Sequence, residues 1–245
     1  METPTYIALS RQMVLRDQMD VVANNLANAN TAGFKAEMML MSEVELPADP
    51  TTELSYVQDF ATARDFSPGT LRPTGNDLDL AIQGDGFFAV QTPEGVRYTR
   101  LGRFQLDKDG TLVTSHGYPV LASGGSVTLD PDDGEVYVGE DGSISTDLAK
   151  NGQLLQVVGK LDVVDFADRA ALKPAPDNLF DAGGQVSTTA TGKVAQRMLE
   201  DSNVRPIVEM TNLIQVTRNY QSMQRFLDNE DERHRRAINS ITSNS

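Results

Sequence analysis

Residues 23–35 read ANNLANANTAGFK, and this stretch decides how the rest of the chain is interpreted. It carries four asparagines before Gly33, and it closes a long run in which apolar residues recur at helical spacing. Asparagine favours helix ends because its amide competes for backbone hydrogen bonds, and glycine commonly follows the last turn of a helix. The stretch therefore predicts the end of a helix and a change of chain direction. A plain polar helix cap is the simplest alternative interpretation.

The run before this stretch predicts one helix of about 25 residues. Thr3 and Pro4 are typical of a helix start, with threonine as the cap and proline at the first helical position. Apolar residues then follow the alternating spacing of four and three that marks a heptad seam. The seam consists of Leu15, Met19, Val22, Leu26 and Ala29.

The other end of the chain, residues 203–245, predicts a second and longer helix of roughly 38 residues. Ser202 or Asn203 is expected to cap it, with Pro206 in its first turn. The two helices lie at opposite ends of the chain, so the simplest expectation is that they pair as one coiled-coil-like unit. The seam of the second helix keeps the same spacing through Leu213, Val216, Tyr220, Met223 and Leu227.

The segments between the helices differ from one another in pattern. Residues 36–75 lack a regular period and predict an extended arm or linker of low intrinsic order, whose methionines favour ordering on a partner over a plain surface linker. Many short apolar runs between Gly, Asp and Pro turns predict a mainly antiparallel β domain over residues 76–185, with an irregular stretch at 167–182. Residues 186–202 are expected to be a return linker. The predicted fold class is therefore α+β, with the β domain inserted between the helical segments 1–35 and 203–245.

Composition excludes several classes of protein. The formal net charge of −14 argues against nucleic-acid binding, which requires a basic surface. Acidic side chains exceed basic ones mainly between the two ends, and the ends themselves are nearly balanced, so they can pack together or against copies of themselves. There is no cysteine, and no apolar run approaches the ~20 residues of a membrane span. The N-terminus lacks the features of a signal peptide, so we expect a cytoplasmic protein or one exported without a cleaved signal.

The sequence offers little that could support catalysis. The turn at 107–110 resembles the start of a calcium loop, but the remaining ligands are missing. His116 follows Ser115 without any pattern of a catalytic triad. We therefore expect no enzyme activity, no cofactor and no metal. A cation- or glycan-binding β module with helical ends is the alternative from a different functional class.

Four stretches, taken in chain order, resemble the bacterial flagellar basal-body rod and hook protein family: residues 23–35, LDLAIQGDGFFAV at 78–90, YTRLGRFQLDKDGTLVTSHGYPVL at 98–121 and SNVRPIVEM at 202–210. Within the family, the length and the opening METPTYIALSRQM look most similar to proximal rod members that carry a β domain, with distal rod members as the alternative.

The resemblance implies a structural component of the flagellar basal-body rod that polymerises through its terminal helices into the periplasmic drive shaft. It implies assembly with other rod proteins and with copies of itself, export through the flagellar type III apparatus without a cleaved signal, and no membrane insertion. The residues expected at the assembly interface are Leu15, Met19, Val22, Asn24, Asn25, Leu26, Asn28, Asn30, Gly33, Phe34, Leu213, Val216, Tyr220, Met223 and Leu227.

Overall fold

The computed structural model describes residues 3–46, 54–123, 125–130, 134–147 and 155–242. Parts of the predicted arm (47–53) and of the predicted terminal segments (1–2 and 243–245) lie outside the described residues. The chain forms two compact units. The helical unit comprises residues 1–29, 36–65 and 204–245, and the β unit comprises residues 30–35 and 66–203.

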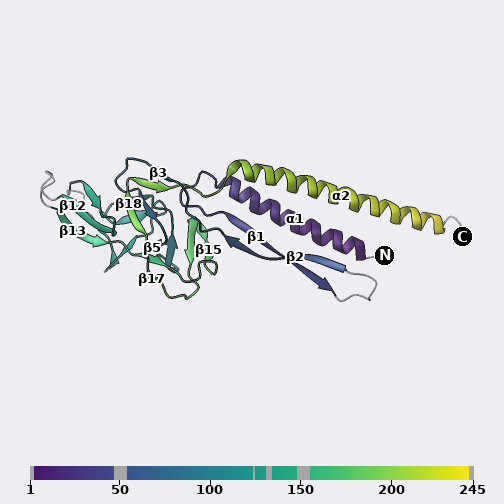
Figure 1. Ribbon diagram of the computed structural model, residues 1–245, viewed down its shortest axis with the longest axis horizontal. Coiled ribbons are helices and arrows are strands. Elements are labelled where there is room, and N and C mark those ends of the chain that lie inside the picture. Colours follow the sequence, from purple (N-terminus) through teal and green to yellow (C-terminus); the bar gives the residue numbers. More distant parts are fainter. Residues whose placement is uncertain (1–2, 47–53, 124, 131–133, 148–154, 243–245) are drawn as a thin grey trace. The chain divides into compact units, whose positions relative to one another are not determined.

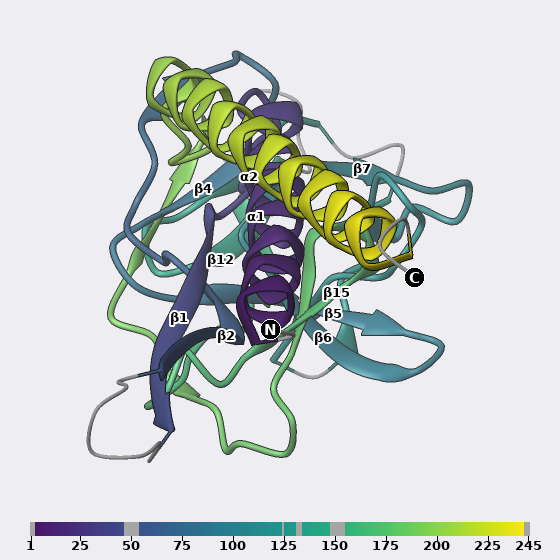
Figure 2. The same cartoon turned by 90° about the vertical axis from the view of Figure 1, so that its right-hand side faces the viewer.

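Two long helices dominate the helical unit. Helix α1 (Thr3–Ala27) and helix α2 (Pro206–Thr242) lie side by side and antiparallel, α1 in purple and α2 in green to yellow (Figures 1 and 2). This arrangement confirms the predicted α+β class, in which terminal helices in contact flank antiparallel sheets. In the part of the chain that the structure describes, neither helix is long and apolar enough to cross a membrane.

The start of α2 differs from the sequence prediction. The helix begins at Pro206, where Glu209 N donates to Arg205 O (3.0 Å), so neither Ser202 nor Asn203 caps it. Asn203 instead directs its side-chain amide to Ser67, where Nδ2 donates to the carbonyl oxygen (3.2 Å) and to Oγ (3.1 Å). Proline at the first helical position is tolerated because its missing N–H would have no helical partner there.

A β-hairpin replaces the irregular arm that the sequence predicted after the asparagine stretch. Strands β1 (Glu37–Leu46) and β2 (Leu54–Arg64) pair antiparallel within the helical unit, and both contact α1. The register shifts between Leu40 and Met41, which is a β-bulge. A bulge adds one residue to a strand and breaks the alternation of its two faces. Here the extra residue is Phe60 of β2, and the run 38–41 of β1 shows no period of two because all four of its residues are apolar.

The central element of the β unit is a six-stranded antiparallel sheet with the strand order β15-β16-β6-β5-β14-β17. Small two- and three-stranded sheets surround it. The strands of the central sheet are β5 (Phe87–Thr92), β6 (Gly95–Thr99), β14 (Val163–Asp165), β15 (Lys173–Ala175), β16 (Leu179–Asp181) and β17 (Thr188–Thr189). The remaining strands are β3 (Leu71–Pro73), β4 (Leu80–Gln83), β7 (Phe104–Leu106), β8 (Leu112–Thr114), β9 (Leu121–Ala122), β10 (Gly125–Ser126), β11 (Val136–Val138), β12 (Ser143–Asp147), β13 (Leu155–Lys160), β18 (Lys193–Gln196) and β19 (Met198–Glu200).

Several stretches between predicted strands also proved to be strands. The stretch 167–182, predicted as irregular, contributes β15 and β16 to the central sheet, joined by a short 3-10 turn at Pro176–Asn178. The predicted return linker 186–202 contains β17, β18 and β19, of which β18 pairs with β4 and β19 with β3. The apolar run 127–129 lies in none of the strands and forms only an isolated bridge between Thr128 and Thr111. Strands of two to four residues carry too little pattern to be recognised from sequence.

Strand β5 is buried on both faces and thereby organises two apolar cores. Phe88 and Val90 belong to the larger core, whereas Phe87 belongs to a smaller aromatic cluster on the opposite face. In that cluster the ring of Phe66 meets those of Phe87 and Phe180 edge-on, with centroids 5.6 and 5.3 Å apart. Edge-to-face packing at these separations is favourable for aromatic rings.

Candidate assembly surface and the signature stretch

The predicted seam of α2 faces the interior of the helical unit. Val216 is buried, and the other four seam residues are half-buried, whereas most neighbouring positions of α2 are exposed. On α1, Leu15 and Val22 are buried, and Met19 and Leu26 are half-buried. The two helices are also joined by Gln12, whose Nε2 donates to Gln224 Oε1 (2.6 Å). These burials are those expected where the apolar stripes of two helices meet.

A second apolar stripe on α2 stays exposed. Ile207, Met210 and Ile214 follow one another by three and four residues, and their exposed fractions are 76%, 46% and 54%. At 100° per residue this stripe lies roughly opposite the seam. On α1, Leu9 and Met13 are likewise exposed. In an isolated chain the helix pair therefore presents apolar surface to water, as is typical of interaction sites.

Two of the predicted asparagines, Asn24 and Asn25, join the end of α1 to the start of β1, and a third, Asn28, bonds back to Asn24. Asn25 is buried; its Nδ2 donates to Glu37 O (2.8 Å), and its Oδ1 accepts from Glu37 N (2.8 Å). Asn24 Nδ2 donates to the Glu37 carboxylate (3.1 Å), and Asn28 Nδ2 donates to Asn24 O (3.0 Å). The amide of Asn25 thus mimics the backbone of a neighbouring strand and satisfies the first residue of β1. Asn30 is exposed.

Gly33 brings the stretch against the β unit. Its φ is +69°, and a Cβ at this position would lie 2.6 Å from Leu101 N, so only glycine fits without strain. Gly33 N donates to Glu200 O (2.7 Å), and Phe34 beside it is buried. The predicted change of direction is therefore held by a backbone contact with β19.

Lys35, the last residue of the stretch, is fully buried and ion-paired. Its Nζ donates to Glu200 Oε1 (2.6 Å) and to Ser67 O (2.8 Å), and Gly69 N also donates to Glu200 Oε1 (2.8 Å). Arg100 NH1 lies 3.4 Å from the other carboxylate oxygen, Oε2. Sequence reasoning missed Glu200, because a single acidic residue after two apolar ones is typical of a solvated strand end.

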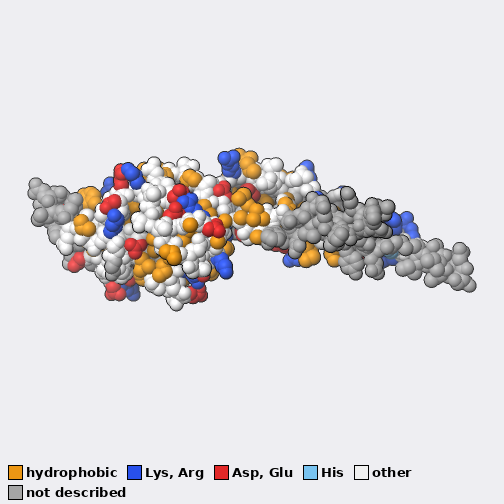
Figure 3. Space-filling model, turned by 60° about the horizontal axis from the view of Figure 1, so that its bottom comes forward, with side chains coloured by type: hydrophobic (Ala, Val, Ile, Leu, Met, Phe, Trp, Pro, Cys, Tyr) orange, Lys and Arg blue, Asp and Glu red, His pale blue; other side chains and the backbone are white. Residues whose placement is uncertain are grey.

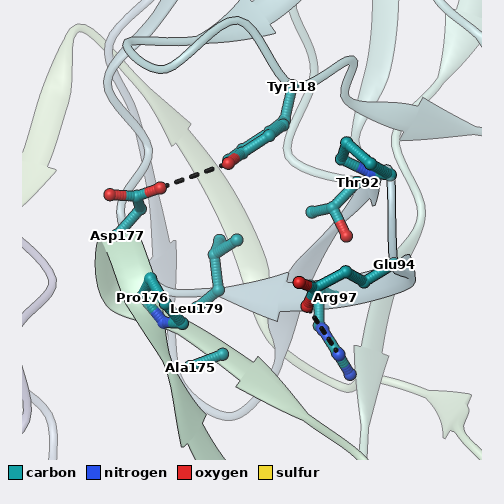
Figure 4. Close-up of a pocket in the computed structure, with 9 residues that line it drawn as sticks. Thr92, Glu94, Arg97, Tyr118, Ala175, Pro176, Asp177 and Leu179 are labelled. Carbon is teal, nitrogen blue, oxygen red and sulfur yellow. Dashed lines mark hydrogen bonds and ion pairs between the residues drawn. The ribbon is translucent and has the colours of Figure 1, made fainter.

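The β unit also contains a small cavity of about 120 Å³. Figure 4 shows Tyr118 pointing toward Asp177, whose Oδ2 accepts from the phenol (3.3 Å), and Arg97 paired with Glu94. Ligand pockets commonly measure roughly 300–1,000 Å³, so this cavity is small for a sugar. Its lining consists of Thr92, Pro93, Glu94, Arg97, Tyr118, Ala175, Pro176, Asp177 and Leu179.

A Ser–His–Asp row lies near this cavity. Ser115 Oγ is 3.4 Å from His116 Nδ1, and His116 Nε2 is 3.3 Å from Asp177 Oδ1. Both separations are long for hydrogen bonds, and the serine is the sequence neighbour of a half-exposed histidine in a surface turn. A nucleophile activated by a base requires closer geometry than this. The row therefore gives no support to hydrolysis.

In the turn at 107–110, which resembled a calcium loop, the first carboxylate is already hydrogen-bonded to the backbone of the same turn. Asp107 Oδ1 accepts from Asp109 N (2.9 Å) and Thr111 N (2.7 Å), an arrangement typical of an Asx turn. Among the described residues, no group of three or more His, Cys, Asp or Glu could hold a metal ion.

On the face shown in Figure 3, acidic and basic side chains of the β unit are interspersed.

Comparison with known proteins gives matches along most of the chain. Residues 6–35 match the family model described as flagella basal body rod protein, residues 81–146 that of the flagellar hook protein FlgE/F/G D1 domain, and residues 195–240 that of the flagellar basal body rod FlgEFG protein C-terminal. The first and last of these segments contain Lys35 and Glu200.

Curated relatives match over nearly their full length. The chain is 42% identical to the flagellar basal-body rod protein FlgF of Caulobacter vibrioides, over 98% of both chains. It is 36% identical to FlgF of Rhizobium meliloti, over 98% of both chains. It is 32% identical to the flagellar basal-body rod protein FlgG of Bacillus subtilis, over 93% of this chain and 94% of the relative.

Proposed function

The chain belongs to the flagellar basal-body rod protein family, and we propose that it polymerises through its terminal helices into the drive shaft of the flagellum. It is a structural component of the basal-body rod and not an enzyme. Family membership implies assembly with other rod proteins. Its partners are copies of itself and neighbouring rod proteins, and it reaches the rod through the flagellar type III export apparatus without a cleaved signal. Relatives named FlgF match over almost the whole chain, which favours a proximal position in the rod.

The observation that carries this proposal is the second apolar stripe on α2. The seam residues pack in the α1–α2 contact within one chain. The stripe of Ile207, Met210 and Ile214 remains, and burying one such side chain contributes about 1.5–3 kcal/mol. We assign the seam to forming the helix pair and the stripe to lateral contacts in the polymer.

The segments of the chain have different roles in this proposal. The helical segments 1–35 and 203–245 form the assembly domain, and the domain at 76–185 lies outside the contacts that build the polymer. The segments 36–75 and 186–202, which carry β1 to β3 and β17 to β19, link the two in sequence. Export of an unfolded chain suits this design, because the chain has no cysteine and no disulfide has to form after transport.

A charge in the stripe tests the proposal. Ile214→Asp places a carboxylate on an exposed position, so the fold of the chain should be unchanged, but lateral contacts should be lost because a buried unpaired charge is strongly unfavourable. We expect export to continue, with the variant absent from purified basal bodies and the cells non-motile. The matched control is Ser222→Asp, which adds the same charge to an exposed position of α2 outside the stripe and should remain motile. Motile cells carrying Ile214→Asp would contradict the proposal.

A further inference from the structure

We propose that Lys35 and Glu200 form a clasp that fastens the segment after α1 to the segment before α2 and so pre-pairs the two helices before assembly. The Glu200 carboxylate joins three separate stretches of the β unit. Through Oε1 it accepts from Lys35 Nζ (2.6 Å) and from Gly69 N (2.8 Å), and Lys35 in turn donates to Ser67 O (2.8 Å). One acidic side chain thus holds residues 33–35, 67–69 and 199–201 together.

Burial makes the clasp a strong constraint. The side chains of Lys35 and Glu200 are each 1% exposed, and that of Arg100 is 3% exposed. Arg100 is held in place by Ile82 O (3.3 Å) and Gly84 O (2.7 Å), with its guanidinium over the ring of Phe87. Removing one member of a buried ion pair leaves an uncompensated charge, which is far more costly than losing an exposed pair. Opening the clasp would expose a charged side chain to water or leave it buried without its partner.

The backbone at the clasp indicates the same fastening independently of the charges. A Cβ at Gly33 would collide with the backbone of Leu101, and one at Gly69 would overlap the carbonyl oxygen of Asp201. Gly33 N also donates to Glu200 O (2.7 Å). Four chain segments, at residues 33, 69, 101 and 200–201, thus lie close together near the point where the two charged side chains meet, with Gly33 against Leu101 and Gly69 against Asp201.

The consequence concerns the pairing of the helices. α1 ends at Ala27 and α2 begins at Pro206, so bringing them together means closing a very long loop. The clasp holds positions 33 and 200, each only six residues from a helix end, within hydrogen-bonding distance. Loop closure is entropically easier for a short loop than for a long one. Lys35 and Glu200 are therefore positioning residues for the helix pair, and only the statement that this pairing precedes assembly rests on the proposed function.

The test uses the full-length chain with Lys35→Met. Peptide-resolved hydrogen exchange should rise about tenfold or more in residues 30–36 and 199–203, and stay within about twofold in β5 and β6, because the loss is local. The matched control is Arg72→Met, which removes the exposed partner of Asp201 (3.0 Å) beside the clasp and should change neither region. Unchanged exchange at 30–36 would overturn the clasp, and so would an equal rise throughout the β unit, which indicates a merely structural role.

A second measurement reads the helix pairing directly. The chain has no cysteine, and Gln12 and Gln224 are hydrogen-bonded across the pair (2.6 Å), so Gln12→Cys with Gln224→Cys reports pairing through a short bismaleimide cross-linker. We expect the cross-linked fraction of monomer to fall severalfold with Lys35→Met or with Gly33→Ala, and not with Arg72→Met. Equal cross-linking in all of them would refute pre-pairing. If cross-linking falls as expected but Ile214→Asp cells are motile, the clasp stands and the proposed polymer contact fails.

Discussion

At the scale of single residues, one guanidinium in the β unit pairs with two carboxylates. Arg169 forms a two-pronged contact with Asp165, from Nε to Oδ1 (2.8 Å) and from NH2 to Oδ2 (2.7 Å), and NH1 donates to Asp85 (2.8 Å). These hydrogen bonds lower the pKa of Asp165 and of Asp85 and raise that of Arg169. A carboxylate with a lowered pKa stabilises the fold above its unfolded pKa of about 4, and this stabilisation is lost as the pH falls through the folded value.

We therefore predict that Arg169→Gln lowers the unfolding free energy at pH 7 by about 1 kcal/mol, a modest value because water screens partly exposed pairs. The fall in melting temperature, roughly 2–4 °C, should shrink below about pH 4 as both carboxylates become protonated. Thermal melts of wild type and variant between pH 7 and pH 3 measure this. Lys108→Gln, at an exposed turn, is the control. A difference that persists undiminished at pH 3 would mean that the carboxylates are not its source.

Single residues also mark the limit of what could be predicted from the sequence. The asparagines of the stretch 23–35 are expected at the end of the first helix, and Asn24, Asn25 and Asn28 form side-chain hydrogen bonds at that end. Glu200 was not expected, because its partner Lys35 lies 165 residues away in sequence. A periodicity argument identifies which face a residue lies on, but a buried ion pair depends on which distant segments meet.

At the scale of elements, the α1–α2 seam yields a prediction about Leu26. Leu26→Asp places a carboxylate at a half-buried seam position, where the cost of desolvating a charge opposes pairing. We expect a smaller helical signal in circular dichroism of the monomer, export that continues, and no incorporation into the rod, hence no motility. Ala23→Asp puts the same charge on an exposed position of α1, three residues earlier, and should keep the helical signal. A motile Leu26→Asp strain would refute the role of the seam.

The elements differ in how well their sequences specify them. Both helices could be predicted because a seam repeated over many turns outweighs local irregularity, and Gly, Asp and Pro turns between short apolar runs indicated the β domain to which β5 to β8 belong. The β1–β2 hairpin differs from the predicted irregular arm, because its run of four apolar residues at 38–41 shows no period of two. Strands β15 and β16 were missed because Pro174 and Pro176 are typical of loops.

At the scale of the whole molecule, the first boundary between the units falls inside the stretch 23–35, between residues 29 and 30. The sequence suggested a helical segment that ends at residue 35, whereas the structure assigns residues 30–35 to the β unit. The chain passes between the units at 29/30, 35/36, 65/66 and 203/204. Composition could not locate these passages, because a six-residue excursion held by Gly33 and Lys35 has no pattern of its own.

This boundary leads to a comparison of two fragments that differ by six residues. Fragment 30–203 keeps Lys35, whereas fragment 36–203 lacks it and leaves Glu200 buried beside Arg100 alone. Since removing one partner of a buried ion pair commonly costs 3–5 kcal/mol, we expect fragment 36–203 to be less stable by about 3 kcal/mol. Its melting temperature should fall by roughly 6–12 °C.

Both fragments should keep the circular dichroism of a β-sheet, and neither should assemble, because both lack α1 and α2. Fragment 30–203 with Lys35→Met is the control for the other five residues, and it should melt close to fragment 36–203. If fragments 30–203 and 36–203 melt at the same temperature, residues 30–35 contribute nothing to the stability of the β unit. Loss of the β-sheet signal in both would instead show that the β unit depends on the helices for its fold.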